Sequence, residues 1–159
     1  MDWKPLTVAI VGYYHDTTCD VAQLQALRTQ GQTTPFSLLF IDPWKLPIRK
    51  DLVDDFCEST GMPGLWFPYD LPPMPRNYDW AVWNTPLLIS ESERIWRYQQ
   101  RRVVTWDILE LVREIPGNIA FRRHHATAKD AEGIWADSIR RPMHDTWTVR
   151  SFPGYVTEV

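Results

Sequence analysis

The chain opens with two apolar strands separated by an amphipathic helix, and this order restricts the fold more than any other feature. Residues 6–11 (Leu-Thr-Val-Ala-Ile-Val) predict a buried strand that runs into a polar turn beginning at Gly12. Leucines at helical spacing predict a helix that begins at Thr18 or Asp20, with either side chain as its cap, and that Gly31 ends. Residues 36–41 predict a second buried strand, so we expect a parallel β-α-β unit.

Polar residues follow both predicted strands directly. The turn from Gly12 to Asp16 follows the first strand, and Asp42 follows the second. Ligands of open parallel sheets bind outside the carboxyl ends of the strands, so we expect a binding site where these two segments meet. Gly12 has no glycine-rich neighbours, so the turn does not have the pattern of a dinucleotide fingerprint.

The remaining pattern predicts that one sheet continues through the chain. Proline and glycine mark the boundaries of a helix over 49–59, which Gly61 stops, and of a short strand over 65–67. Apolar spacing predicts helices over 77–88, 106–114 and 126–140, and strands over 94–98, 118–122 and 146–149. We therefore expect a single α/β domain over residues 1–159, with a mostly parallel, Rossmann-like central sheet flanked by helices.

Composition excludes several classes of protein. The formal charge of -3 gives no electrostatic reason to expect binding to nucleic acid, which usually requires a basic face. No run of about 18 apolar residues is present, so we expect no transmembrane helix. Cys19 and Cys57 have neither zinc-ligand nor disulfide spacing. The first residues lead into a strand without a small-residue cleavage site, and we expect a cytoplasmic protein.

Tryptophan and proline are unusually frequent. The chain has nine tryptophans and thirteen prolines, and the prolines concentrate between Pro63 and Pro86. Proline cannot continue a helix or pair in an interior strand, so this segment predicts a short strand and then a long, rigid loop. Aromatic side chains held on such a loop, Trp66 and Tyr69 among them, could form a surface for a protein partner.

The order of elements resembles the family-two glycosyltransferases of the GT-A fold. The residues that carry the resemblance are the first strand and its polar turn, the helix segment Leu24-Gln25-Ala26-Leu27-Arg28, the acid Asp42, and the asparagine elements Arg76-Asn77 and Trp83-Asn84. The similarity extends over residues 6–111. It implies a nucleotide-diphosphate-sugar as donor substrate, with no cofactor that can be named for certain.

The same resemblance implies roles for individual residues. Asp42 would contact the base or ribose, and the pocket would be lined by Gly12, Tyr13, Asp16 and Asn84. At the position where the family carries its acidic metal motif, residues 98–104 contain no carboxylate. Arg101 and Arg102 could instead face the diphosphate, because guanidinium groups pair with phosphate oxygens. We therefore predict no metal site.

The sequence leaves the activity open. Asp107 and Asp130 are candidates for the base that deprotonates an acceptor hydroxyl, with Asp145 as a further one. Adjacent His124 and His125 would point about 100° apart on a helix, so they do not predict a shared metal ion. Asp42 favours a glycosyltransferase-like protein that binds and transfers a nucleotide-sugar. The missing acidic motif favours a non-catalytic structural or interaction module of the same fold.

Overall fold

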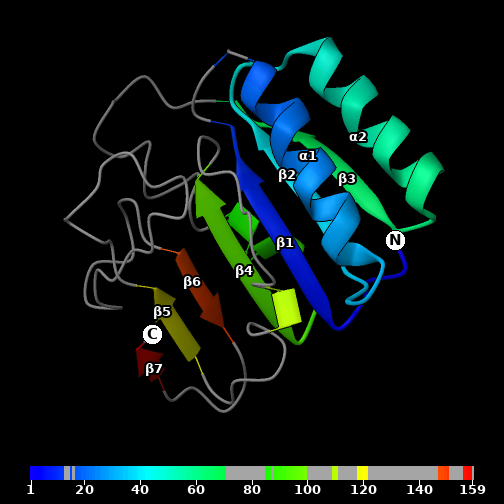
Figure 1. Ribbon diagram of the computed structural model, residues 1–159. Helices are drawn as coiled ribbons and strands as arrows, with labels where there is room; N and C mark the ends of the chain where they lie inside the picture. Colours follow the sequence, from blue (N-terminus) through cyan, green and yellow to red (C-terminus); the bar gives the residue numbers. More distant parts are fainter. Residues whose placement is uncertain are drawn as a thin grey trace, which may run out of the picture.

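The described part of the chain forms one α/β sheet with two long helices (Figure 1). The computed structural model describes residues 1–12, 15, 17–70, 85–86, 88–99, 109–110, 118–121, 147–150 and 156–158. Its elements are β1 (Leu6–Val11), α1 (Thr18–Gly31), β2 (Ser37–Asp42), α2 (Pro47–Thr60), β3 (Gly64–Pro68), β4 (Arg94–Gln99), β5 (Asn118–Phe121), β6 (Trp147–Arg150) and β7 (Val156–Glu158).

The seven strands lie in the order β3-β2-β1-β4-β6-β5-β7. The first four of these are parallel neighbours; β6 is antiparallel to both β4 and β5, and β7 is parallel to β5. The helices α1 and α2 cover the same face of the parallel part (Figure 1). The sequence-based expectation of a mostly parallel, Rossmann-like α/β sheet is therefore confirmed.

Burial on both faces explains why β1 and β2 are mainly apolar, with Thr7, Ser37 and Asp42 as their buried polar residues. Every residue of β1 and of β2 is buried. Leu6, Val8 and Ile10 pack on the face covered by the helices, whereas Ala9 and Val11 pack into a second cluster on the opposite face. A strand that is buried on both faces does not alternate between apolar and polar residues, and its sequence is a nearly continuous apolar run.

The helix α1 begins at Thr18, as expected, but its capping differs from the sequence-based expectation. Thr17 is the N-cap residue and makes no side-chain capping bond, and Asp20 lies within the helix, where it is fully buried. The predicted capping role of Thr18 or Asp20 is therefore wrong. Gly31 is the last residue of the helix, and it packs closely on Met62, since a Cβ there would lie 2.5 Å from Cε of Met62.

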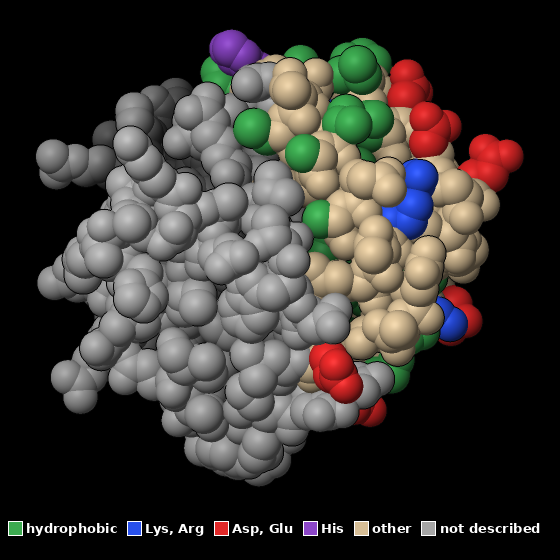
Figure 2. Space-filling view, in the orientation of Figure 1, with side chains coloured by type: hydrophobic (Ala, Val, Ile, Leu, Met, Phe, Trp, Pro, Cys, Tyr) green, Lys and Arg blue, Asp and Glu red, His purple; other side chains and the backbone are tan. Residues whose placement is uncertain are grey.

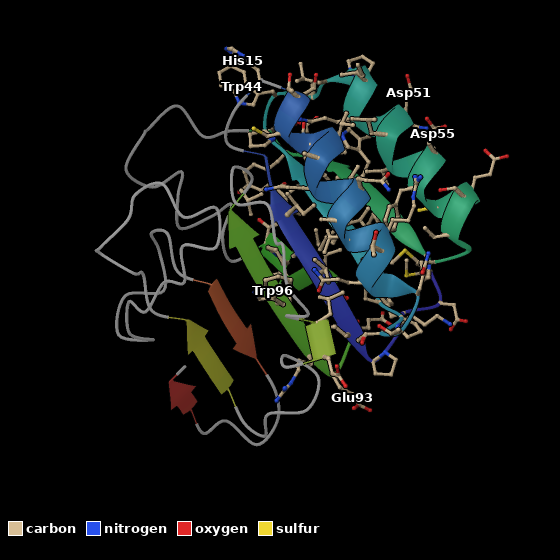
Figure 3. All side chains as sticks on the ribbon, viewed as in Figure 1. His15, Trp44, Asp51, Asp55, Glu93 and Trp96 are labelled. Atoms are coloured by element: carbon tan, nitrogen blue, oxygen red, sulfur yellow. The ribbon has the colours of Figure 1, made fainter. Side chains whose placement is uncertain are left out.

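The helix α2 follows the sequence pattern closely. Pro47 stands in its first turn, and Gly61 follows it with a φ of 72°, the left-handed conformation that glycine adopts without steric cost. Val53 and Phe56 are buried against the sheet. The acidic side chains of the opposite face are exposed, and Figure 3 shows Asp51 and Asp55 pointing outward.

The later elements are described in part. The predicted strands near residues 94, 118 and 146 are confirmed as β4, β5 and β6, whereas the short β7 has no counterpart in the sequence-based expectation. Residues 85–86 and 88–89 are helical at the end of the predicted helix over 77–88 and one residue beyond it, and residues 109–110 are helical within the predicted helix over 106–114. The predicted helix over 126–140 lies outside the described residues. Among the described helices, none has the length and apolar character needed to cross a membrane.

Candidate functional site at the carboxyl edge of the sheet

The sheet reverses its direction of growth at β1. From β1 the chain proceeds to β2 and then to β3 on one side, and β4 is added on the other side. Val11, the last residue of β1, is in register with Ile41 of β2 and with Gln99 of β4. Gly12 follows at this switch point and donates its backbone N–H to the carbonyl of Ile41 at 2.8 Å. In α/β sheets such a switch point is the place where a ligand can enter between diverging loops.

Gly12 has no room for a side chain. A Cβ at this position would lie 2.8 Å from Nη1 of Arg49 and 2.9 Å from Cε1 of Phe40. Nη1 of Arg49 also donates a hydrogen bond to the carbonyl oxygen of Gly12 at 3.3 Å. The glycine therefore permits a buried guanidinium to lie directly beneath the first loop of the edge.

Arg49 joins three elements through a buried ion-pair triad, which consists of Asp20, Asp42 and Arg49. Its Nε donates to Oδ2 of Asp20 in α1 at 2.9 Å, and its Nη1 donates to Oδ1 of Asp42 at 2.7 Å. All three side chains are fully buried. The guanidinium also lies over the ring of Phe40, 5.4 Å from its centroid. Arg49 thus fixes the end of β2 against the starts of both helices.

Neither Arg49 nor Asp20 was among the residues that the sequence singled out for the site. One signal was nevertheless present, because Asp20 precedes Leu24 and Leu27 by four and seven residues and so lies on the apolar stripe of its helix. A buried carboxylate requires a cationic partner. Arg49, close behind Asp42 in the sequence, was a nearby cation that could have met this need.

Asp42 organises the loop that follows it. Its Oδ1 accepts from the backbone N–H of Trp44 at 3.1 Å, and its Oδ2 accepts from the N–H of Leu46 at 2.7 Å and from Nε1 of Trp66 at 3.0 Å. The side chain has no exposed surface. The predicted contact between Asp42 and a base or ribose stays a prediction, and in this conformation such a contact would require one of these bonds to be exchanged.

Two side chains of this loop are presented to solvent. Trp44 is 47% exposed, and its ring meets that of His15 nearly at right angles, at a centroid distance of 4.9 Å (Figure 3). Lys45 has a φ of 53°, the one positive value at a non-glycine residue among the described part of the chain. Its ammonium group pairs with the carboxylate of Asp70, beyond the end of β3. The edge therefore carries an aromatic ring beside a cation.

The structure brings two of the predicted site residues together, Gly12 and Asp42, through their common partner Arg49. The other predicted site residues lie outside the described residues; they are Tyr13, Asp16, Asn84, Arg101, Arg102, Asp107 and Asp130. Within the described part of the chain, no group of three or more His, Cys, Asp or Glu side chains is arranged to hold a metal ion.

Comparison with known proteins finds similarity among solved structures, but not among protein families or curated sequences. No protein-family model and no curated protein matches the sequence. Among solved structures, the chain is similar to 4-diphosphocytidyl-2C-methyl-D-erythritol synthase from Anaerococcus prevotii. The TM-score is 0.49 at 10% sequence identity, and the match covers 92% of this chain and 70% of that one. A similarity at this level carries no information about activity.

Proposed function

We propose that this chain binds a nucleoside diphosphate or nucleotide-sugar at the carboxyl edge of β1 and β2, in the manner of a GT-A glycosyltransferase. One observation carries the proposal: the buried triad of Asp20, Asp42 and Arg49 rigidly joins the two loops that flank the switch point. Burying three ionised groups is costly unless their geometry is well satisfied. A buried and well-bonded triad at the edge where ligands bind supports a pre-organised site.

We further propose that the bound sugar is transferred to the hydroxyl group of an acceptor. The bond between the anomeric carbon and the diphosphate oxygen would break, and a bond from the acceptor hydroxyl oxygen to that carbon would form. The hydroxyl proton would go to a carboxylate, for which Asp107 and Asp130 remain the candidates. Arg101 and Arg102 would stabilise the departing diphosphate with their positive charge.

Calorimetry and thermal denaturation with uridine and guanosine diphosphates test the binding. At a ligand concentration 100 times the dissociation constant, we expect the free energy of unfolding to rise by about 2.7 kcal/mol. We expect the same affinity in chelator and in manganese. Incubation with the matching nucleotide-sugars and a panel of acceptors should then release the nucleoside diphosphate.

The outcomes separate the parts of this proposal. If no nucleoside diphosphate binds at millimolar concentration, the proposed function is wrong. Binding that tightens tenfold or more in manganese would contradict the metal-free part alone, and would direct attention to carboxylates such as Glu91 and Glu93. Binding without release of product from any nucleotide-sugar would restrict the chain to a binding function.

A protein-interaction module is a second candidate, favoured by exposed apolar side chains. Val21, Trp44 and Ile48 are 53%, 47% and 51% exposed, and Figure 2 shows hydrophobic side chains at the end of the molecule where α1 and α2 begin. Trp66 and Tyr69, by contrast, are partly buried against the sheet. Most of the proline-rich loop lies outside the described residues. Light scattering tests this candidate: association that Ile48→Ser abolishes would support it, and a monomer at high concentration would contradict it.

A further inference from the structure

We infer that Trp44 and Lys45 are the ligand-contacting pair of this edge: the indole ring stacks on a nucleobase and the ammonium group binds a phosphate. The inference rests on the proposed function and names two residues that make contact with its ligand. It is drawn from the geometry of the loop, which holds an aromatic ring and a cation in adjacent positions at the edge of the sheet.

The backbone of Lys45 is strained. A φ of 53° lies in the left-handed region, which a lysine adopts at a steric cost that glycine would avoid. Strained residues of this kind concentrate at functional sites, where the surrounding structure holds them in place. Here the hydrogen bonds from Trp44 and Leu46 to the buried Asp42 fix the residues on both sides of Lys45.

The ring of Trp44 is exposed but held in place. Its backbone is fixed by Asp42, and its ring is braced by the ring of His15 from the neighbouring loop. A tryptophan held in this way loses little conformational entropy when a flat ligand stacks on it. Stacking of a base on an aromatic side chain is tolerant of base identity.

The ammonium group of Lys45 has only an exposed carboxylate, that of Asp70, as its ion-pair partner among the described residues. The side chains of Lys45 and Asp70 are 49% and 88% exposed, and an exposed pair of this kind is held weakly. A phosphate carries more negative charge than one carboxylate and offers more acceptor oxygens. A phosphate group of the ligand can therefore displace Asp70 from the ammonium group at small cost.

Calorimetry on matched variants tests the pair with uridine and guanosine diphosphates, the corresponding nucleosides, and inorganic pyrophosphate as separate probes. We expect Trp44→Ala to weaken nucleoside and nucleotide binding about tenfold or more while leaving pyrophosphate binding unchanged. We expect Lys45→Gly to weaken binding of the two nucleoside diphosphates and of pyrophosphate about tenfold. Trp44→Phe should retain most of the affinity.

Stability measurements separate a ligand-binding role from a structural one. Lys45→Gly removes the left-handed strain, so its melting temperature should equal or exceed that of the unaltered protein, although binding is lost. Lys50→Gln is the matched control, because it removes an exposed cation of α2 that pairs with Asp54. It should change neither property.

The outcomes are distinguishable from those of the proposed function. If the unaltered protein binds a nucleoside diphosphate and Trp44→Ala and Lys45→Gly bind it equally well, the inference is overturned and the proposed function stands. If Lys50→Gln loses as much affinity as Lys45→Gly, the loss comes from the change in net charge and not from the position of Lys45. That result would also overturn the inference. If the unaltered protein binds none of the probes, both are overturned.

Discussion

At the scale of single residues, the chain depends on one arginine that the sequence did not mark. Arg49 neutralises part of the charge of Asp20 and Asp42, and it does so with no access to water. Removing one partner from a buried ion pair leaves a charge without compensation, and this costs more than the pair itself contributes. Arg49 is therefore expected to matter more for stability than any exposed charged residue.

We expect Arg49→Met to lower the free energy of unfolding by about 3–5 kcal/mol, measured by chemical denaturation. Lys50→Met is the control, because this neighbouring cation is exposed, and it should change stability by less than about 0.5 kcal/mol. Adding Asp20→Asn to Arg49→Met should recover part of the loss, since one uncompensated charge is removed. Equal stability of Arg49→Met and Lys50→Met would contradict this account of the triad.

Asp42 shows how far a residue can be interpreted from its position alone. Its place at the end of β2 was predicted from the apolar run before it, and the structure confirms that place. The sequence did not reveal that its carboxylate already accepts hydrogen bonds from Arg49, Trp66 and two backbone N–H groups. These partners come from four positions between 44 and 66, and only the folded chain brings them together.

At the scale of elements, the packing of α2 against β3 depends on a contact that no sequence pattern reveals. A Cβ at Gly64 would lie 2.4 Å from Sγ of Cys57. Burial, with a smaller contribution from Asp54, raises the pKa of the Cys57 thiol, so the thiol is neutral and slow to alkylate at neutral pH. The close approach of the Cys57 thiol leaves no room for a side chain at position 64.

We expect Gly64→Ala to destabilise the fold by about 1–3 kcal/mol, because the added methyl group overpacks this contact. It should also speed the alkylation of Cys57 by displacing the thiol toward solvent. Cys57→Ala should rescue Gly64→Ala, so that in a double-mutant cycle the double variant loses less than the sum of the two single losses. Strictly additive losses would mean that the two residues do not share this contact.

The elements themselves were largely predictable, because periodicity and chain breakers are local properties. Apolar runs located β1 and β2 to within a few residues. Pro47 and Gly61 marked the two ends of α2. The start of α1 at Thr18 was predicted, but its capping residue was not, because Asp20 forms a buried ion pair with Arg49 instead of capping the helix. The short β7 was missed because three residues carry too little periodicity.

At the scale of the whole molecule, the arrangement of strands determines where a ligand can bind. Sequence patterns predicted a mostly parallel sheet, but not that β6 would lie antiparallel between β4 and β5. Strand order depends on long-range pairing, which a single sequence does not display. The resulting switch point at Gly12 brings the first two loops of the chain to one edge, and the triad joins them there.

Hydrogen–deuterium exchange, measured with and without saturating uridine or guanosine diphosphate, tests the nucleotide site at this edge most directly. The account predicts slower exchange in the two loops at residues 12–17 and 42–46, and little change in β5 and β6, farther along the sheet. Unchanged exchange in both loops, or protection confined to other segments, would contradict the claim that the carboxyl edge of β1 and β2 is the nucleotide site.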